Sequence, residues 1–316
     1  MLTLREMAEK YKYLFGPVPS RRLGRSLGID LIPFKTCSYN CVYCQLGQTT
    51  HQTVEREEYV PSEEVLKELE QKLKENVEID FLTFSGSGEP TLHSGIGRII
   101  SELKKITSLP IAVLTNGSLL SEKEVRKDLL KADVILPTLS SVNPESFQQI
   151  HRPHPGLQLE KIIQGMIELR KEFKGEIWLE VFLVQGINDT EEEMKALKKV
   201  IEKISPEKIQ LNTSVRIPAE EFSLTVPEDK MEKLAELLEE KAEVISESSY
   251  FTPAYQKADE QEILNYLKRR PGTLQDICQG LGVHPDQALK YLNQLLEKGK
   301  ISLRVWQNQK EYYLKK

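Results

Sequence analysis

Between residues 28 and 212 the sequence alternates short apolar stretches with helical patterns, and this alternation most restricts the possible folds. Each of six strand-like stretches is followed by a helical pattern after a short connection. This order predicts an α/β fold with a parallel sheet and right-handed crossovers. Six strands are too few for a closed eight-stranded barrel. The predicted strands are 28–33, 80–85, 111–115, 133–139, 177–184 and 208–212.

The predicted helices within this region share the amphipathic 3.6-residue period. They are 62–76, 95–107, 122–131, 159–173 and 190–203, and a charged helix at 228–241 follows. A short polar helix is also predicted at the N-terminus. Segment 15–26 is predicted to be a loop because its Gly and Pro residues break regular structure. Its three arginines are candidates for gripping an anion, or simply form a solvated charged loop.

Three cysteines, Cys37, Cys41 and Cys44, fall within eight residues directly after an apolar run. Soft thiolates at this spacing suit zinc or an iron–sulfur cluster. Structural zinc usually takes four ligands in two separated pairs, and iron–sulfur clusters normally use four cysteines. Three ligands would leave one iron of a four-iron cluster open to an exchangeable group. A zinc knuckle and three buried thiols remain the alternatives, and Cys278 is expected to be a buried apolar residue.

Polar and glycine residues at the ends of the predicted strands form the second set of candidates. Gly86 and Gly88 let the backbone approach a ligand closely, and Glu89, followed by Pro90, adds a carboxylate. Carboxyl ends of parallel strands meet at one edge, where ligands bind. Further candidates at such ends are Thr115, Asn116, Thr138 and Ser140, which could instead be turn residues or satisfied strand hydroxyls.

The spacing Cys-x3-Cys-x2-Cys, with Tyr43 before the last cysteine, resembles the signature of the radical S-adenosylmethionine (radical SAM) superfamily. Residues 86–90 resemble that family's Gly-Gly-Glu-Pro motif, with Ser87 where a neighbouring motif residue would stand. The resemblance implies a partial (β/α)6 radical SAM barrel and a [4Fe-4S] cluster on the three cysteines. It further implies that SAM binds the open iron and is cleaved to a 5′-deoxyadenosyl radical. The implied SAM-binding residues are Tyr43, Gly86, Gly88, Glu89, Pro90, Thr115, Asn116, Thr138 and Ser140.

Three segments, 15–47, 151–165 and 211–218, resemble the radical SAM group that contains wyosine-type tRNA-modifying enzymes. This resemblance implies RNA as the leading substrate class, although the wyosine-base synthases carry extra cysteines and this chain has only Cys278 to spare. A protein side chain or a small metabolite is the alternative substrate. A redox-sensing regulator that binds DNA is the alternative from another class. A reductant such as a flavodoxin or ferredoxin is the expected protein partner.

Residues 259–316 are predicted to form a separate unit after a barrel region at 1–242 and a linker at 243–258. Helices at 259–268, 273–280 and 285–298, then a hairpin at 300–304 and 311–314, resemble a winged helix. From residue 268 to 316 there are ten Lys or Arg against four Asp or Glu. This local excess of positive charge favours contact with a nucleic acid such as RNA, and a protein-docking or structural module is the alternative.

The composition is consistent with an enzyme that works in a reducing compartment. Four cysteines, three of them in one motif, do not make a disulfide framework. No uncharged run is long enough to cross a bilayer, and there is no signal-peptide core, so no membrane association and a cytoplasmic location are expected. The net charge of −5 does not mark the whole chain as a nucleic-acid binder.

Two further stretches are less specific. His151 and His154 could bind a metal, but Pro153 between them prevents a regular helix that would aim both rings together. A loop that directs His and Arg toward a substrate, or a structural turn, is the more plausible interpretation. Arg216 follows the last predicted strand and is a candidate contact for an anionic substrate, or else a surface ion-pair partner.

Overall fold

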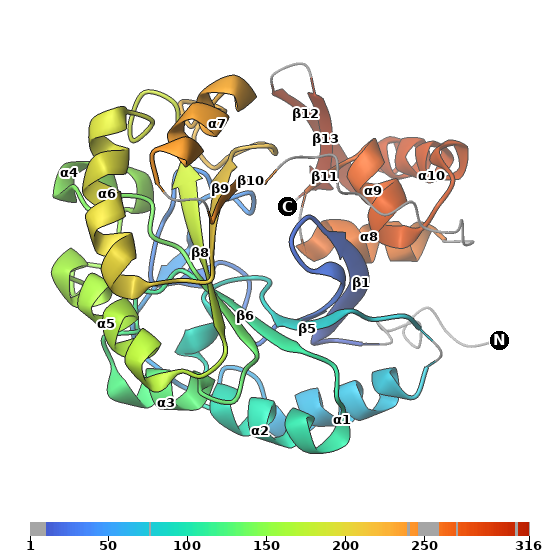
Figure 1. Ribbon diagram of the computed structural model, residues 1–316. Coiled ribbons are helices and arrows are strands. Elements are labelled where there is room, and N and C mark those ends of the chain that lie inside the picture. Colours follow the sequence, from blue (N-terminus) through green and yellow to red (C-terminus); the bar gives the residue numbers. More distant parts are fainter. Residues whose placement is uncertain are drawn as a thin grey trace.

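An open eight-stranded sheet forms the centre of the protein in the computed structural model (Figure 1). The structure describes residues 11–75, 77–238, 241–245, 259–269, 271–306 and 309–315. The strand order is β1-β2-β5-β6-β7-β8-β9-β10. These strands are β1 (Leu14–Ser20), β2 (Gly24–Ile29), β5 (Phe81–Phe84), β6 (Ile111–Thr115), β7 (Val134–Pro137), β8 (Glu176–Leu183), β9 (Lys208–Thr213) and β10 (Ala242–Val244).

Helices follow the strands and lie around the outside of the sheet (Figure 1). Their inner faces carry apolar residues at helical spacing, as α2 shows with Ile96, Ile99, Ile100 and Leu103, all buried. The helices of this region are α1 (Ser62–Leu73), α2 (Ile96–Ile106), α3 (Lys123–Leu129), α4 (Pro144–His151), α5 (Leu159–Glu172), α6 (Glu191–Ile204) and α7 (Glu228–Glu236), with the 3-10 helix η1 (Pro90–Leu92).

The predicted α/β fold with six parallel strands is confirmed. Strands β2, β5, β6, β7, β8 and β9 pair in parallel in that order. Two strands that were not predicted extend the sheet: β1 pairs antiparallel with β2, and β10 pairs parallel with β9. β1 and β10 are not neighbours in the sheet, so the described strands do not close into a complete barrel.

The prediction that 15–26 is a loop was wrong, because this segment forms the β1–β2 hairpin. β1 is an edge strand, where Pro17 and Pro19 need not donate to a second neighbour. The register shifts between Phe15 and Val18, which accommodates the intervening Gly and Pro. The first parallel strand therefore begins and ends about four residues earlier than predicted. The predicted N-terminal helix lies mostly outside the described residues.

Helix α4 was also not predicted, although Asn143 and Pro144 gave the signal. The Asn143 side chain accepts hydrogen bonds from the backbone N–H groups of Glu145 and Ser146, and Pro144 occupies the first helical position. β10 overlaps the start of the predicted linker, whose residues 246–258 lie outside the described part of the chain.

Two arginines in the β1–β2 turn show that the sheet curls. Arg22 donates to Glu180 on β8 at 2.9 Å, and Arg21 donates to Asn212 on β9 at 3.2 Å. Three strands separate β2 from β8 in the sheet order, so these side chains reach across the inside of a curved sheet. Arg21 also donates to the carbonyl oxygen of Ile245, just after β10, and so links the two open edges. This is a partial barrel.

Residues 259–315 have a hydrophobic core of their own. Beside β1 (Figure 1) lie three helices and a three-stranded sheet in the order β11-β13-β12. Arg216, after β9, joins this unit to the barrel through an ion pair with Asp276 at 2.9 Å. The elements are α8 (Glu260–Arg269), β11 (Gly272–Thr273), α9 (Leu274–Leu281), α10 (Pro285–Glu297), β12 (Ile301–Trp306) and β13 (Gln309–Leu314).

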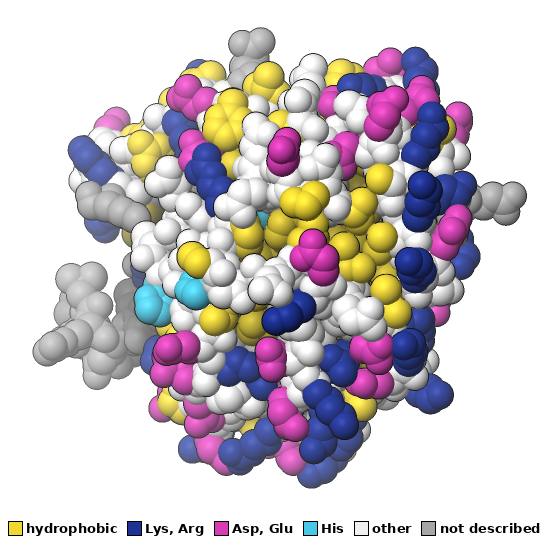
Figure 2. All heavy atoms as spheres, turned by 90° about the vertical axis from the view of Figure 1, so that its left-hand side faces the viewer, with side chains coloured by type: hydrophobic (Ala, Val, Ile, Leu, Met, Phe, Trp, Pro, Cys, Tyr) yellow, Lys and Arg dark blue, Asp and Glu magenta, His cyan; other side chains and the backbone are white. Residues whose placement is uncertain are grey.

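The surface is heavily charged, as the composition suggests. Figure 2 shows the side of the molecule on which α4, α5 and α6 lie, where hydrophobic side chains gather near the middle of the face and charged side chains surround them. No helix in the described part of the chain is both long and apolar enough to span a membrane.

The buried pair of Arg22 and Glu180 yields a first prediction. Their side chains are only 16% and 13% exposed. Burial alone would raise the pKa of Glu180, but Arg22 and the donors on Thr138 and Asn212 outweigh it and hold this pKa below its usual value. A depressed carboxyl pKa stabilises the fold above the unfolded-state pKa, and this contribution is lost as pH falls through the folded-state pKa.

Glu180→Gln should lower the free energy of unfolding at neutral pH by roughly 3 kcal/mol, because Arg22 then loses its buried partner. In urea unfolding, the difference between wild type and variant should shrink once the pH falls below the ordinary carboxyl pKa of 4.5. Glu191→Gln, which removes an exposed partner of Lys195, is the control and should change stability little. An equal loss at neutral and acidic pH would contradict this account of Glu180.

Candidate active site

The cysteine loop lies at the carboxyl end of the sheet and is held through its backbone. Val42 donates its N–H to the carbonyl of Ile150 at 2.9 Å, and Asn40 donates to the carbonyl of His151 at 3.0 Å. Tyr39 forms a β-bridge with Pro153. The C-terminal end of α4 and the residues after it therefore support the loop that carries Cys37, Cys41 and Cys44.

The contact with the cysteine loop favours the structural interpretation of the His151–His154 stretch. His151 ends α4 and is fully buried, whereas His154 keeps exposed surface. The N–H of His154 donates to the carbonyl of Ser38 at 2.9 Å. The stretch is a structural support for the cysteine loop, and its two imidazole rings do not form a joint metal site.

All three cysteines of the loop are free thiols. Each residue keeps some exposed surface, yet the protein around each sulfur raises its pKa. Burial raises the pKa of Cys37 to about 12, and the negative charge of Glu89 adds to the effect. Burial is the main cause that raises the pKa of Cys41, and the negative charges of Cys37 and Cys44 add to it. Three thiolates this close together and this deeply buried would repel one another. They would therefore be stabilised by a positively charged group bound between them.

The donor set fits an iron–sulfur cluster better than zinc. Among the described residues, no three His, Cys, Asp or Glu side chains are placed to hold one metal ion. Thiolates that bind three different irons of one cluster need not converge on a single point. Cys278, the remaining cysteine, is buried in the core of residues 259–315, as predicted. The chain thus offers three thiols at this site and no fourth.

Gly88 packs directly against the cysteine loop. A Cβ atom at this position would lie 1.8 Å from the carbonyl oxygen of Thr36. Two backbone hydrogen bonds bracket the contact: Lys35 N–H donates to Ser87 at 2.8 Å, and Glu89 N–H donates to Thr36 at 3.3 Å. The glycine that was predicted to approach a ligand approaches the protein's own cysteine loop.

Gly86 and Ser87 are anchored to the end of β2. Gly86 has a φ of +137°, and a Cβ atom there would meet the Asp30 carboxyl group. Asp30 accepts hydrogen bonds from the N–H and the hydroxyl of Ser87 at 3.0 and 2.5 Å. Residues 86–90 therefore join the cysteine loop to the sheet.

Glu89 is buried, with 2% of its surface exposed, and links η1 to the end of β6. Its Oε1 accepts from the hydroxyls of Thr91 and Thr115, each at 2.6 Å, and its Oε2 accepts from the N–H of Asn116 at 2.7 Å. Burial raises the pKa of Glu89 despite these donors. The N–H of Thr91 also donates to Oε1, at 3.1 Å. Each carboxylate oxygen has about two acceptor positions, so Oε2, with the single donor from Asn116, retains room for one further donor such as an ammonium group.

Asn116 brings this network to the cysteines. Its side-chain amide donates to the Ser38 hydroxyl at 2.8 Å and lies 3.5 Å from the sulfur of Cys37. At the end of β7, the Thr138 hydroxyl donates to Glu180 at 2.8 Å. The hydroxyl of Ser140 is buried and has no hydrogen-bond partner among the described residues. Ser140 is therefore freer than Thr138 to bind a ligand.

Tyr43 stacks on Phe182, with ring centroids 3.7 Å apart. The structure thus brings Cys37, Glu89, Thr115 and Asn116 into one hydrogen-bonded network. Glu180 was not predicted to belong to the site, and His151 was considered as a metal-binding, substrate-directed or structural residue but not as the neighbour of a cysteine. Glu180 could have been noticed as the one carboxylate within the predicted strand 177–184, whereas nothing in the sequence placed His151 against a cysteine.

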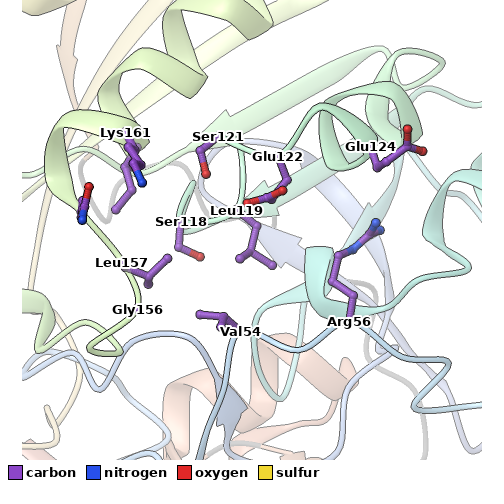
Figure 3. Close-up of a pocket in the computed structure, with 12 residues that line it drawn as sticks. Val54, Arg56, Ser118, Leu119, Ser121, Glu122, Glu124, Gly156, Leu157 and Lys161 are labelled. Atoms are coloured by element: carbon purple, nitrogen blue, oxygen red, sulfur yellow. The ribbon is translucent and has the colours of Figure 1, made fainter.

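A hollow of about 330 Å³ lies beside this network (Figure 3), and none of its lining residues is a predicted SAM ligand. In the close-up, Ser118, Leu119, Leu157 and Val54 surround the open space. Ser118 bonds to Ser38 of the cysteine loop at 2.6 Å. Most of the polar residues at its rim are exposed, so the shape alone does not mark the reactive centre.

Comparison with known proteins decides the family. The sequence model of the Radical SAM superfamily matches residues 31–201, more than half of the chain. The chain belongs to the radical SAM superfamily. The matched region includes the three cysteines, Glu89, Asn116 and Ser140.

Whole-chain relatives agree with this result. A UPF0026 protein of Methanocaldococcus jannaschii is 36% identical over 293 residues, which cover 92% of this chain and 88% of that protein, so the chain also belongs to the UPF0026 family. A Brachyspira hyodysenteriae protein named GTPase Obg is 41% identical over 296 residues, or 92% of this chain and 44% of that protein. The chain thus spans less than half of the length of this relative.

A solved structure shares the fold. SuiB of Streptococcus suis, bound to the precursor peptide SuiA, matches with a TM-score of 0.55 and 11% identity over 71% of this chain and 49% of that chain. Family membership confirms the predictions that this protein is an enzyme and that its cofactors are a [4Fe-4S] cluster and SAM. The roles of the individual residues stay predictions.

The cysteines give the second prediction. In anaerobically reconstituted protein, changing Cys37, Cys41 and Cys44 together to Ala should abolish the cluster, because these thiolates hold its irons. Iron analysis and visible absorption spectroscopy check this. Cys278→Ala is the matched control and should keep about four irons per chain. Unchanged iron in the triple variant would refute the proposed ligands.

The third prediction concerns Gly88. Gly88→Ala should destabilise the protein by more than about 3 kcal/mol and impair cluster retention. The new methyl group would clash with the backbone carbonyl of Thr36, which cannot move aside as the end of a flexible side chain can. Gly186→Ala is the control: this glycine has a φ of +80° but nothing within 4 Å of a new Cβ. It should cost only about 1 kcal/mol of left-handed strain. Equal losses in denaturant unfolding would mean that the Thr36 contact does not matter.

Proposed function

We propose that this enzyme reductively cleaves SAM at a [4Fe-4S] cluster on Cys37, Cys41 and Cys44, and that the resulting 5′-deoxyadenosyl radical modifies a macromolecular substrate, with RNA as the leading candidate. The single observation that carries the proposal is the set of three free thiols, one of which, Cys37, is joined through Asn116 to the Glu89 network. When bound, the cluster supplies the electron for SAM cleavage. A flavodoxin or ferredoxin is the proposed source of that electron.

The chain's own residues would bind and orient SAM. The open acceptor position on Oε2 of Glu89 suits the SAM ammonium group, and the Ser140 hydroxyl, which has no partner in the described part of the chain, suits a ribose hydroxyl. Tyr43 and Phe182, stacked beside the cysteine loop, exclude water from the side of the site that they cover. Thr138 is committed to Glu180, so we assign it a supporting role.

The unit formed by residues 259–315 is the reason for proposing a macromolecular substrate. Arg216 pairs with Asp276 of α9 and also donates to Gln45, the residue after Cys44, at 2.9 Å. A polymer held by this unit would therefore lie near the cysteine loop. The excess of Lys and Arg over Asp and Glu from residue 268 to 316 favours RNA as that polymer.

Ion pairs within this unit limit which of its Lys and Arg side chains could bind the phosphate groups of RNA. Lys298 and Lys300 pair with Glu260, and Arg304 pairs with the buried Glu311. Three exposed lysines of the unit make no ion pair with a described residue, and we assign the phosphate contacts to them: Lys290, Lys310 and Lys315.

A protein substrate is the second candidate. The SuiB structure, which has the same fold, contains a bound precursor peptide, and the paired charges of Lys298, Lys300 and Arg304 reduce the basic surface that RNA could use. A small metabolite would not need residues 259–315 at all. A redox-sensing regulator would not need the buried carboxylate and amide network beside the cysteines.

Incubation of the reduced, reconstituted enzyme with SAM and cellular RNA, and separately with cellular protein, distinguishes these substrates. Mass spectrometry of nucleosides and peptides should find the modification in RNA, together with 5′-deoxyadenosine. Modified peptides and unmodified RNA would replace the leading candidate with the second one. Absence of 5′-deoxyadenosine from every incubation would refute the proposed reaction itself.

The fourth prediction tests the lysines. Changing Lys290, Lys310 and Lys315 together to Ala should reduce the slope of log affinity for single-stranded RNA against log salt by about 2, because each phosphate contact contributes about 0.7. Changing Lys195, Lys199 and Lys203, which share one face of α6, is the control with the same loss of charge. Binding that does not depend on salt, or equal slopes for both variants, would exclude phosphate contacts by these lysines.

A further inference from the structure

The imidazole of His151 contacts one of the cysteine ligands directly. Its Nδ1 atom lies 3.4 Å from the sulfur of Cys41. The same residue accepts the backbone N–H of Asn40 through its carbonyl oxygen at 3.0 Å. Two contacts thus hold His151 against the cysteine loop: its ring meets the sulfur of Cys41, and its carbonyl group binds the backbone of Asn40.

The ring is enclosed on its other sides by aromatic residues. Its centroid lies 4.9 Å from that of Phe147, 5.1 Å from that of Tyr39 and 5.8 Å from that of Tyr43. His151 has no exposed surface, and its Nε2 atom has no hydrogen-bond partner among the described residues. Among the described residues, the sulfur of Cys41 is therefore the hydrogen-bonding partner of the imidazole, and the negative charge of Glu180 also acts on the ring.

We propose that His151 donates a hydrogen bond from Nδ1–H to the Cys41 thiolate and thereby raises the reduction potential of the bound cluster. The inference rests on the proposed ligation of the cluster by Cys41. It gives His151 the role of a positioning residue that acts through a ligand and does not touch SAM or the substrate.

The choice of tautomer follows from the neighbours of the two ring nitrogens. A neutral imidazole carries one N–H, at either Nδ1 or Nε2. With the proton on Nε2, a buried N–H would lack an acceptor and the Nδ1 lone pair would face a thiolate. With the proton on Nδ1, the N–H has the thiolate as its acceptor, and only an acceptor atom is left without a partner. An unpaired buried donor costs free energy, so the second arrangement is favoured once Cys41 is deprotonated.

The effect on the potential is electrostatic. Reduction adds negative charge to a cluster and to its thiolates, so a donor that points at a thiolate stabilises the reduced form more than the oxidised form. The aromatic surroundings exclude water and strengthen the interaction. Loss of the donor should thus shift the midpoint potential to more negative values, by about 59 mV for each tenfold change in the one-electron equilibrium.

Three reconstituted variants test this effect. His151→Leu removes the donor, His151→Asn keeps an amide N–H near the position of Nδ1 on a smaller group, and His154→Gln is the control in the same supporting stretch. Iron content and absorption first show whether each protein holds its cluster. An EPR-monitored redox titration should then give a more negative potential for His151→Leu, partial recovery for His151→Asn and no change for His154→Gln.

A second measurement needs no variant at position 151. Wild-type protein labelled with 15N-histidine should show a 15N coupling to the reduced cluster in pulsed EPR, and the labelled His154→Gln protein should keep it. A cluster without histidine coupling, or one whose potential is the same in His151→Leu and wild type, would overturn the role of His151 while the proposed function stands. Wild-type protein that binds no cluster would overturn the proposed function as well.

Discussion

The active end of this enzyme depends on a close packing of backbone against backbone. The carbonyl of Thr36 occupies the space in which any side chain at position 88 would lie. From that contact the chain leads one way to the cysteine loop and the other way to Glu89, whose carboxylate ties η1 to the end of β6. The thiols and the candidate SAM-binding groups are thus parts of one rigid assembly. Such preorganisation suits a site that must hold a cofactor and a substrate in fixed orientation.

The same assembly is supported from outside by α4. The carbonyl groups at the C-terminal end of a helix lack partners within the helix. Here Ile150 and His151 use theirs to accept N–H groups of the cysteine loop. The loop buries the side chains of Tyr39 and Val42, and its backbone hydrogen bonds to the end of α4 and to Glu89, the residue before η1, add to the order that this packing provides. The aromatic residues around His151 complete the support by packing.

The parallel strands and their helices could be predicted because apolar periodicity is local, and the cysteine and Glu89 motifs because spacing alone suggests their chemistry. The β1–β2 hairpin was missed because Pro17 and Pro19 contradict strand propensity, and only the edge position, a property of the whole sheet, makes them tolerable. Glu180 and His151 are isolated residues whose partners are distant in sequence. Nothing local shows that Arg22 crosses the sheet to Glu180 or that His151 meets Cys41.

The position of residues 259–315 also depends on such distant contacts. Asp276 caps α9 together with Thr273 and pairs with Arg216, and Arg216 in turn donates to Gln45 beside Cys44. One acidic side chain therefore serves both the folding of the C-terminal unit and its attachment to the cysteine loop. The side chains of Arg216 and Asp276 are only 18% and 11% exposed, so separating the two units would leave both charges to be solvated again. Because breaking a poorly solvated ion pair is costly, this junction favours a fixed orientation of the unit next to the active end over a loosely tethered one.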